Sequence, residues 1–318
     1  MFSAILPDLN WRKKQMNNAY LFLAFLGLLW TLVAIILSEA KQRGASVNHF
    51  YCFGSSVAVL LLFLTGFFLN GLNNVFAPEY RSALFCFIAA ALLNGSGQAL
   101  CMSNLKQGGR ALAYSIPLLS FLLPYGWSLV CWGEPLAWRG IAGVLLIAAA
   151  LFYLATRRTA KDEEQTHSSA LEPKRILIAF ASMILIGSGQ ILMSTPSRFS
   201  AESLLSPWSG ACVLQASNAL FFLGRSLCTK GVTFPQLKCS LRAGILWGFC
   251  AAACYATLLQ TLRLLGEIKQ AGLLFPVGNS MTILLFTAFT AVRFREKLTV
   301  AQWTAFAGVV AGIFLVKL

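Results

Sequence analysis

The sequence predicts an all-α integral membrane protein with ten transmembrane helices arranged as two inverted five-helix repeats. Three observations lead to this fold class: the composition, the length of the apolar runs and the likeness of the two halves. Of the 318 residues, 58% are hydrophobic and only 11% are charged, and the mean hydropathy is +0.71. A soluble domain carries about 25% charged residues. Only a bilayer can cover this much apolar surface.

Ten apolar runs are each close to the length of about 20 residues that a helix needs to cross a bilayer. They lie at residues 19–38, 49–70, 82–104, 109–132, 138–156, 175–195, 208–228, 242–262, 271–292 and 299–317. The runs do not alternate between polar and apolar residues, so helices are favoured over the strands of a barrel.

A polar stretch at residues 157–174 divides the ten runs five and five, giving one repeat at 1–156 and another at 175–318. The pattern W-x-x-x-A-G-V opens the fifth run of each half, from Trp138 and from Trp303. An odd number of spans makes the second half enter the bilayer from the other side. Inverted repeats are typical of secondary transporters, which bind substrate near the membrane midplane.

Acidic turns precede both copies of this pattern. Gly133-Glu134-Pro-Leu stands before Trp138, and Arg295-Glu296-Lys-Leu-Thr-Val-Ala-Gln leads into Trp303. These segments and the five-plus-five layout resemble the drug/metabolite transporter superfamily, EamA type, whose motif is R/G-E-x-L-x-x-x-Q-W-x-G. Ala305 takes the usual glycine place in the second copy, and the first copy lacks the glutamine before Trp138.

The resemblance implies a multi-pass protein of the cell (inner) membrane with both termini cytoplasmic. It also implies a central cavity surrounded by spans 1–4 and 6–9, while spans 5 and 10 lie outside the cavity and offer a surface for a homodimer. The motif marks a fold and names no substrate.

The net charge of +14 comes from Lys and Arg scattered between the runs. Without a basic stripe interleaved with aromatic residues, nucleic acid is not an expected partner, and the charge fits membrane surfaces. With cytoplasmic termini, nine of the 25 Lys and Arg would lie inside and sixteen outside. The positive-inside rule therefore favours the opposite orientation.

The tetrapeptide Gly-Ser-Gly-Gln occurs twice inside apolar runs, at residues 95–98 and 187–190. An unpaired amide in hydrocarbon costs several kcal/mol, so Gln98 and Gln190 must face other helices or a watery cavity. Asn94 and Gln98 are four residues apart and share one helix face. Two interpretations remain open: the glycines and glutamines join helices, or the polar groups bind a substrate.

Further polar groups occur at span depth, and Gln215 and Asn218 are among them. Pro276 and Gly278 lie close to Asn279, and a proline inside a helix frees a backbone carbonyl. The complete set of candidate substrate-binding residues is Asn94, Ser96, Gln98, Tyr114, Ser188, Gln190, Tyr255, Asn279 and Ser280.

None of the eleven acidic residues lies mid-span, whereas exporters of lipophilic cations usually need a buried carboxylate. The expected function is therefore secondary-active or facilitative transport of a small neutral or zwitterionic metabolite, a sugar or an amino acid, by alternating access. A multidrug or organic-cation exporter of the same fold is one alternative. A non-transporting membrane enzyme or receptor is another, although no catalytic constellation, metal cluster or nucleotide loop predicts an enzyme or a cofactor.

Overall fold

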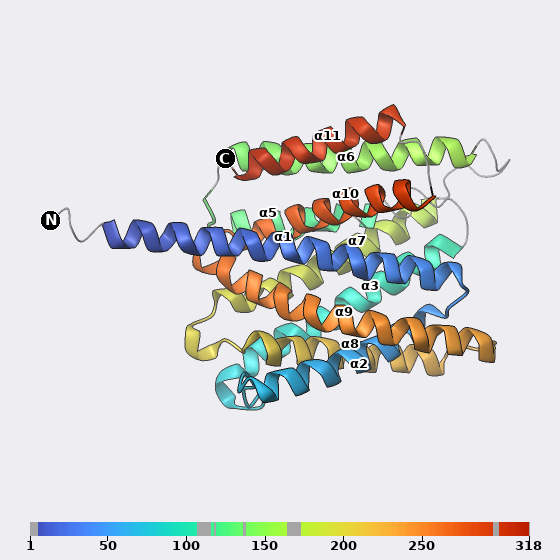
Figure 1. Ribbon diagram of the computed structural model, residues 1–318, viewed down its shortest axis with the longest axis horizontal. Coiled ribbons are helices and arrows are strands. Elements are labelled where there is room, and N and C mark those ends of the chain that lie inside the picture. Colours follow the sequence, from blue (N-terminus) through green and yellow to red (C-terminus); the bar gives the residue numbers. More distant parts are fainter. Residues whose placement is uncertain are drawn as a thin grey trace. The chain divides into compact units, whose positions relative to one another are not determined.

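The computed structural model describes residues 6–106, 116–117, 119–135, 138–163, 173–294 and 299–317. Every regular element within these residues is a helix (Figure 1). In this part of the chain, six helical segments are long and apolar enough to cross a membrane: Gln15–Gln42, Val47–Phe68, Pro78–Asn104, Lys174–Arg198, Phe234–Glu267 and Ala271–Arg293. The protein is therefore all-helical and of the membrane type.

Nine of the ten predicted apolar runs each lie on one helix. These helices are α1 (Leu6–Gln42), α2 (Val47–Phe68), α3 (Arg81–Lys106), α6 (Trp138–Glu163), α7 (Pro173–Ser194), α8 (Pro207–Leu227), α9 (Phe234–Glu267), α10 (Leu274–Phe294) and α11 (Val300–Lys317). The fourth run is described in part, by the 3-10 turn Leu119–Phe121 and by α5 (Leu122–Val130). The candidate Tyr114 lies outside the described residues.

Local sequence signals explain where several helices begin. Ser206 caps α8, because its hydroxyl accepts a hydrogen bond from the Ser209 amide at 3.1 Å, and Pro207 follows it. At α9, Thr233 and Gln236 form a reciprocal capping box. The turn before α9 contains Gly231, whose φ of +77° is a conformation that glycine adopts without strain.

The polar stretch between the halves is partly helical. The sequence predicts a connecting loop from 157, but α6 continues to Glu163, and α7 begins at Pro173. Residues 157–163 contain arginine, alanine, lysine and glutamate, which are strong helix formers and extend α6 beyond its apolar part. Residues 164–172 lie outside the described residues.

The chain divides into two compact units that cut across the two halves of the sequence. The first unit contains residues 1–92 and 192–274, and the second contains 93–191 and 275–318. Each unit thus combines segments from both halves. These units group residues by their contacts, whereas a repeat groups them by sequence and topology. The repeat boundary at residues 157–174 therefore stays a prediction.

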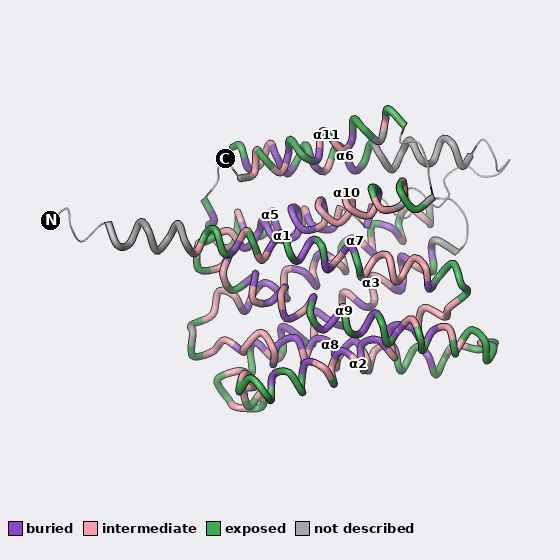
Figure 2. Tube along the Cα trace, viewed as in Figure 1, coloured by how far each residue is buried: buried purple, intermediate pink, exposed green. Residues whose placement is uncertain are grey.

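In the first unit, α2 packs against both α8 and α9 (Figure 1). Tyr51 stacks on Phe222 with ring centroids 4.7 Å apart, and Trp247 meets Tyr51 edge-on at 5.4 Å. Buried residues are concentrated where these three helices meet (Figure 2). At Gly248 a Cβ atom would lie 2.6 Å from the Gly54 carbonyl oxygen, so glycine permits close approach of α2 and α9.

In the second unit, α6 and α11 run side by side (Figure 1). A Cβ atom on Gly143 would lie 2.6 Å from the Gly312 carbonyl oxygen, and one on Gly308 would lie 3.1 Å from the Ala150 Cβ. Gly143 and Gly308 are the glycines of the two W-x-x-x-A-G-V patterns. The repeated pattern therefore has a packing role, because it brings the last helices of the two halves together.

Candidate substrate site

The Asn94 and Gln98 side chains are half-buried on one face of α3. At 1.5 Å per residue, Asn94 lies about 20 Å along the helix from Arg81 and about 15 Å from Asn104. Asn94 is thus close to the middle of the segment Pro78–Asn104 that is suited to cross a membrane, and Gln98 lies one turn nearer its Asn104 end. Among the described residues, neither side chain has a hydrogen-bond partner.

Gly97, between these two amides, is a contact point between α3 and α7. The Ser182 hydroxyl donates a hydrogen bond of 2.7 Å to the Gly97 carbonyl oxygen. A Cβ atom on Gly97 would lie 2.7 Å from Ile186 Cγ1 and 3.0 Å from the Ser182 carbonyl oxygen. The first Gly-Ser-Gly-Gln copy therefore contains a helix-packing glycine next to amides without a partner among the described residues. The packing interpretation holds for Gly97, and substrate binding by Asn94 and Gln98 stays a prediction.

The second copy lies on α7 and is packed more tightly. A Cβ atom on Gly187 would contact Leu123 and lie 2.8 Å from the Ser120 carbonyl oxygen. Gln190, one turn further on, is only 9% exposed and interacts with other residues. Gln190 is thus engaged by the protein, unlike Gln98.

The two serines of the repeated tetrapeptide, Ser96 on α3 and Ser188 on α7, are half-buried and without a partner among the described residues. Ser188 shares one face of α7 with Leu177 and Ile184, which are both exposed. Ser96 likewise shares one face of α3 with the exposed Phe85 and Leu92. Both serines therefore lie on the more exposed faces of their helices.

The candidates of α10 differ in availability. Ser280 is fully buried, and its hydroxyl donates a 2.5 Å hydrogen bond to the Pro276 carbonyl oxygen one turn earlier. Asn279 is half-buried and has no hydrogen-bond partner among the described residues. The Ser280 hydroxyl is therefore already hydrogen-bonded within α10, while Asn279 retains an amide that can bind a ligand.

Tyr255 lies in the first unit, apart in sequence from the other candidates. Its hydroxyl interacts with the side chain of Gln215 on α8, which is fully buried. Neither amide atom of Gln215 reaches full hydrogen-bond geometry with a described residue. Sequence reasoning left Gln215 outside the candidate set, although an amide within an apolar run was the signal that could have included it.

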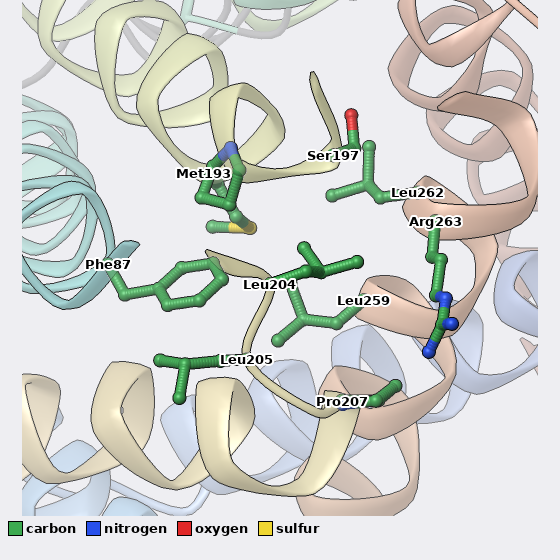
Figure 3. Close-up of a pocket in the computed structure, with 10 residues that line it drawn as sticks. Phe87, Met193, Ser197, Leu204, Leu205, Pro207, Leu259, Leu262 and Arg263 are labelled. Carbon is green, nitrogen blue, oxygen red and sulfur yellow. The ribbon is translucent and has the colours of Figure 1, made fainter. Parts of the chain in front are cut away.

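A small cavity in the first unit has a mostly apolar lining (Figure 3). Its volume is about 20 Å³, which holds little more than one water molecule. Among its lining residues, Ser197 already donates to the Ser194 carbonyl oxygen at 2.7 Å, and Arg263 is 3.7 Å from Glu267. This cavity is too small and too apolar for a metabolite.

Acidic groups are scarce in the described part of the chain, and no three His, Cys, Asp or Glu side chains come together there as a metal site. Glu134 is the one described acid that is buried, at 7% exposure, and it interacts with other residues. It follows α5 in the turn toward α6, at the end of an apolar helix.

No family model and no curated protein matches the chain, whereas chains of solved structures do. One of these, described only as "Crystal structure of protein", is 17% identical, with a TM-score of 0.71. The similarity covers 94% of this chain and 97% of that chain. The likeness therefore extends over nearly the whole length and concerns the fold.

Proposed function

We propose that the protein is a secondary-active or facilitative carrier of a small polar, neutral or zwitterionic metabolite, of the sugar or amino-acid class, that works by alternating access. The observation that carries this proposal is the pair of amides on α3. Asn94 lies near the middle of the helix and Gln98 one turn further on, both without a partner among the described residues. Polar groups at that depth are costly unless they serve a ligand or a watery path.

The helix contacts support a two-fold relation between the halves, as an inverted repeat requires. Such a repeat equates α1 with α7, α2 with α8, α3 with α9 and α6 with α11. In the first unit α1 packs on α9, and in the second Ser182 of α7 bonds to Gly97 of α3. Under the same equivalence, the contact between α2 and α9 corresponds to a contact between α8 and α3. This second contact is present where Phe87 of α3 lies against Gly210 of α8. These pairs exchange under the proposed equivalence, as expected for two related halves. Ten spans in two inverted repeats and EamA-type membership are proposed from this relation and from the motif that leads into Trp303.

Uptake into proteoliposomes tests the proposal. Full-length protein is first screened for thermal stabilisation by sugars, amino acids, nucleosides and organic cations, and each stabilising compound is then assayed for flux. We expect a neutral or zwitterionic compound to raise the melting temperature and to enter the vesicles saturably. Turnover of a compound without flux would instead favour an enzyme, and tight binding without flux a receptor.

The coupling of transport provides a second test. Because no described acid lies mid-span, we expect uptake to persist when the pH gradient is dissipated. The conservative variants Glu134→Gln and Glu267→Gln should each keep the uptake rate within about twofold of wild type. Glu267 is the control, since its carboxylate is exposed and accepts a hydrogen bond from Gln15 at 2.8 Å. Wild-type uptake that collapses when the pH gradient is dissipated, together with loss of uptake in Glu134→Gln but not in Glu267→Gln, would favour the cation-exporter alternative, because Glu134 is buried.

We also propose, by family likeness, that the protein lies in the cell (inner) membrane with cytoplasmic termini. In this orientation Cys131, which is exposed in the turn after α5, faces the cytoplasm, and Ser168 in the stretch between the halves faces outward. A membrane-impermeant maleimide added to intact cells should modify a Ser168→Cys variant and spare Cys131. The reverse pattern would establish the orientation that the Lys and Arg tally favours.

A further inference from the structure

A surface groove of about 420 Å³ lies at the end of α8, within the first unit. Its lining consists of Asn48 from α2 and of Phe221, Gly224, Arg225, Cys228 and Thr229 from α8 and the residues that follow it. The groove lies at the first turn of α2, which begins at Val47, and at the last turn of α8, which ends at Leu227. In a membrane protein that level corresponds to the lipid headgroups.

One side of the groove is polar and internally ordered. Arg225 Nε donates to the Asn48 side-chain oxygen at 3.4 Å, and the Asn48 amide nitrogen donates to the Thr229 hydroxyl at 2.8 Å. The Thr229 hydroxyl donates in turn to the Arg225 carbonyl oxygen at 2.7 Å. These contacts orient the guanidinium through Nε and leave its terminal N–H groups available.

Arg225 is exposed, and no acidic side chain of the described residues pairs with it. An arginine held in this way matches the planar, bidentate geometry by which guanidinium groups bind phosphate.

The other side of the groove is apolar. A Cβ atom on Gly224 would meet nothing within 4 Å, so the floor of the groove is open. Phe221 lines the groove one turn nearer the membrane interior than Arg225, and its neighbour Leu220 is 70% exposed. A ligand with a phosphate on Arg225 would therefore lay any attached hydrocarbon along Phe221 and Leu220.

The charges around the groove favour an anion. Five further Lys and Arg are exposed at this end of the first unit, against a single described acid, Glu39, which is paired with Arg43 at 3.0 Å. These basic residues are Lys41, Arg43, Lys230, Lys238 and Arg242. Clustered basic residues at headgroup level attract anionic lipids.

We propose that this groove binds an anionic phospholipid, with the phosphate on Arg225 beside Asn48 and Thr229 and the acyl chain along Phe221 and Leu220. The site rests on the α2–α8 contact and is independent of the transport proposal. Bound lipid would cover Cys228, whose thiol is exposed in the structure.

The test follows maleimide modification of Cys228 in the full-length protein in neutral detergent, mapped by peptide mass spectrometry. Micelles containing phosphatidylglycerol should slow modification of Cys228 and leave Cys131 unchanged. Arg225→Gln should weaken this protection about tenfold, because a charge-assisted bidentate contact is lost. Lys230→Gln is the matched control, since it removes an equally exposed cation that does not line the groove.

Gly224→Leu separates shape from charge. It fills the groove without altering any charge, and the open space at Gly224 predicts an unchanged melting temperature together with lost protection. Equal protection by phosphatidylcholine, or by inorganic phosphate alone, would overturn the assignment to an anionic phospholipid. Equal weakening by Arg225→Gln and Lys230→Gln would show diffuse surface attraction and would likewise overturn the site.

Discussion

Gly97→Val is expected to destabilise the protein by about 2 kcal/mol or more, because the added side chain enters a close helix contact. The nearest atoms include the Ile186 backbone nitrogen and the Ser182 carbonyl oxygen, both 3.0 Å from the position of the new Cβ. Backbone atoms cannot turn away as a side-chain end can, so α7 must shift. The shift would also break the hydrogen bond from Ser182 to the Gly97 carbonyl. The melting temperature in detergent measures the effect.

Gly126→Val is the matched control for this substitution. Gly126 is also a helical glycine, on α5, but a Cβ atom there would meet nothing within 4 Å. The same chemical change should therefore leave the melting temperature close to that of wild type. Ser182→Ala isolates the hydrogen bond and should cost about 1 kcal/mol. If both valine variants lost stability equally, the close contact at Gly97 would not be the cause.

Asn94→Ala and Gln98→Ala are each expected to weaken substrate binding by about 1–3 kcal/mol, the cost of leaving a buried polar partner unsatisfied. In affinity this is about a 5- to 150-fold loss. Neither amide bonds to a described residue, so the melting temperature of the free protein should change little. Calorimetric titration of the compound found by the stability screen measures the affinity, and uptake should fall in parallel.

Gln190→Ala provides the contrast, because Gln190 is buried and already interacts with other residues. We expect it to lower the melting temperature more than Gln98→Ala does and to lower the affinity less. Unchanged affinity in both the Asn94→Ala and Gln98→Ala variants would remove these residues from the proposed site. Asn279, on α10, would then be the amide to test.

The candidate site could be predicted from the sequence only as a list of residue types at span depth. An amide or hydroxyl inside an apolar run is visible without a structure, and Asn94, Gln98 and Asn279 were found in that way. Which polar groups the protein itself satisfies depends on their surroundings. Ser280 bonds to its own helix, whereas Gln215 is fully buried beside Tyr255.

The membrane class and the positions of the helices could be predicted from the amino-acid sequence, because hydropathy and helix propensity act over neighbouring residues. It also marked the repeated W-x-x-x-A-G-V pattern, whose glycines pack α6 against α11. The contact of Gly97 with α7 could not be predicted in this way, since its hydrogen bond joins residues 85 positions apart. Only the tertiary structure assigned segments of both halves to each compact unit. Close packing depends on the shapes of surfaces that are distant in the chain, and no local average of residue properties contains that information.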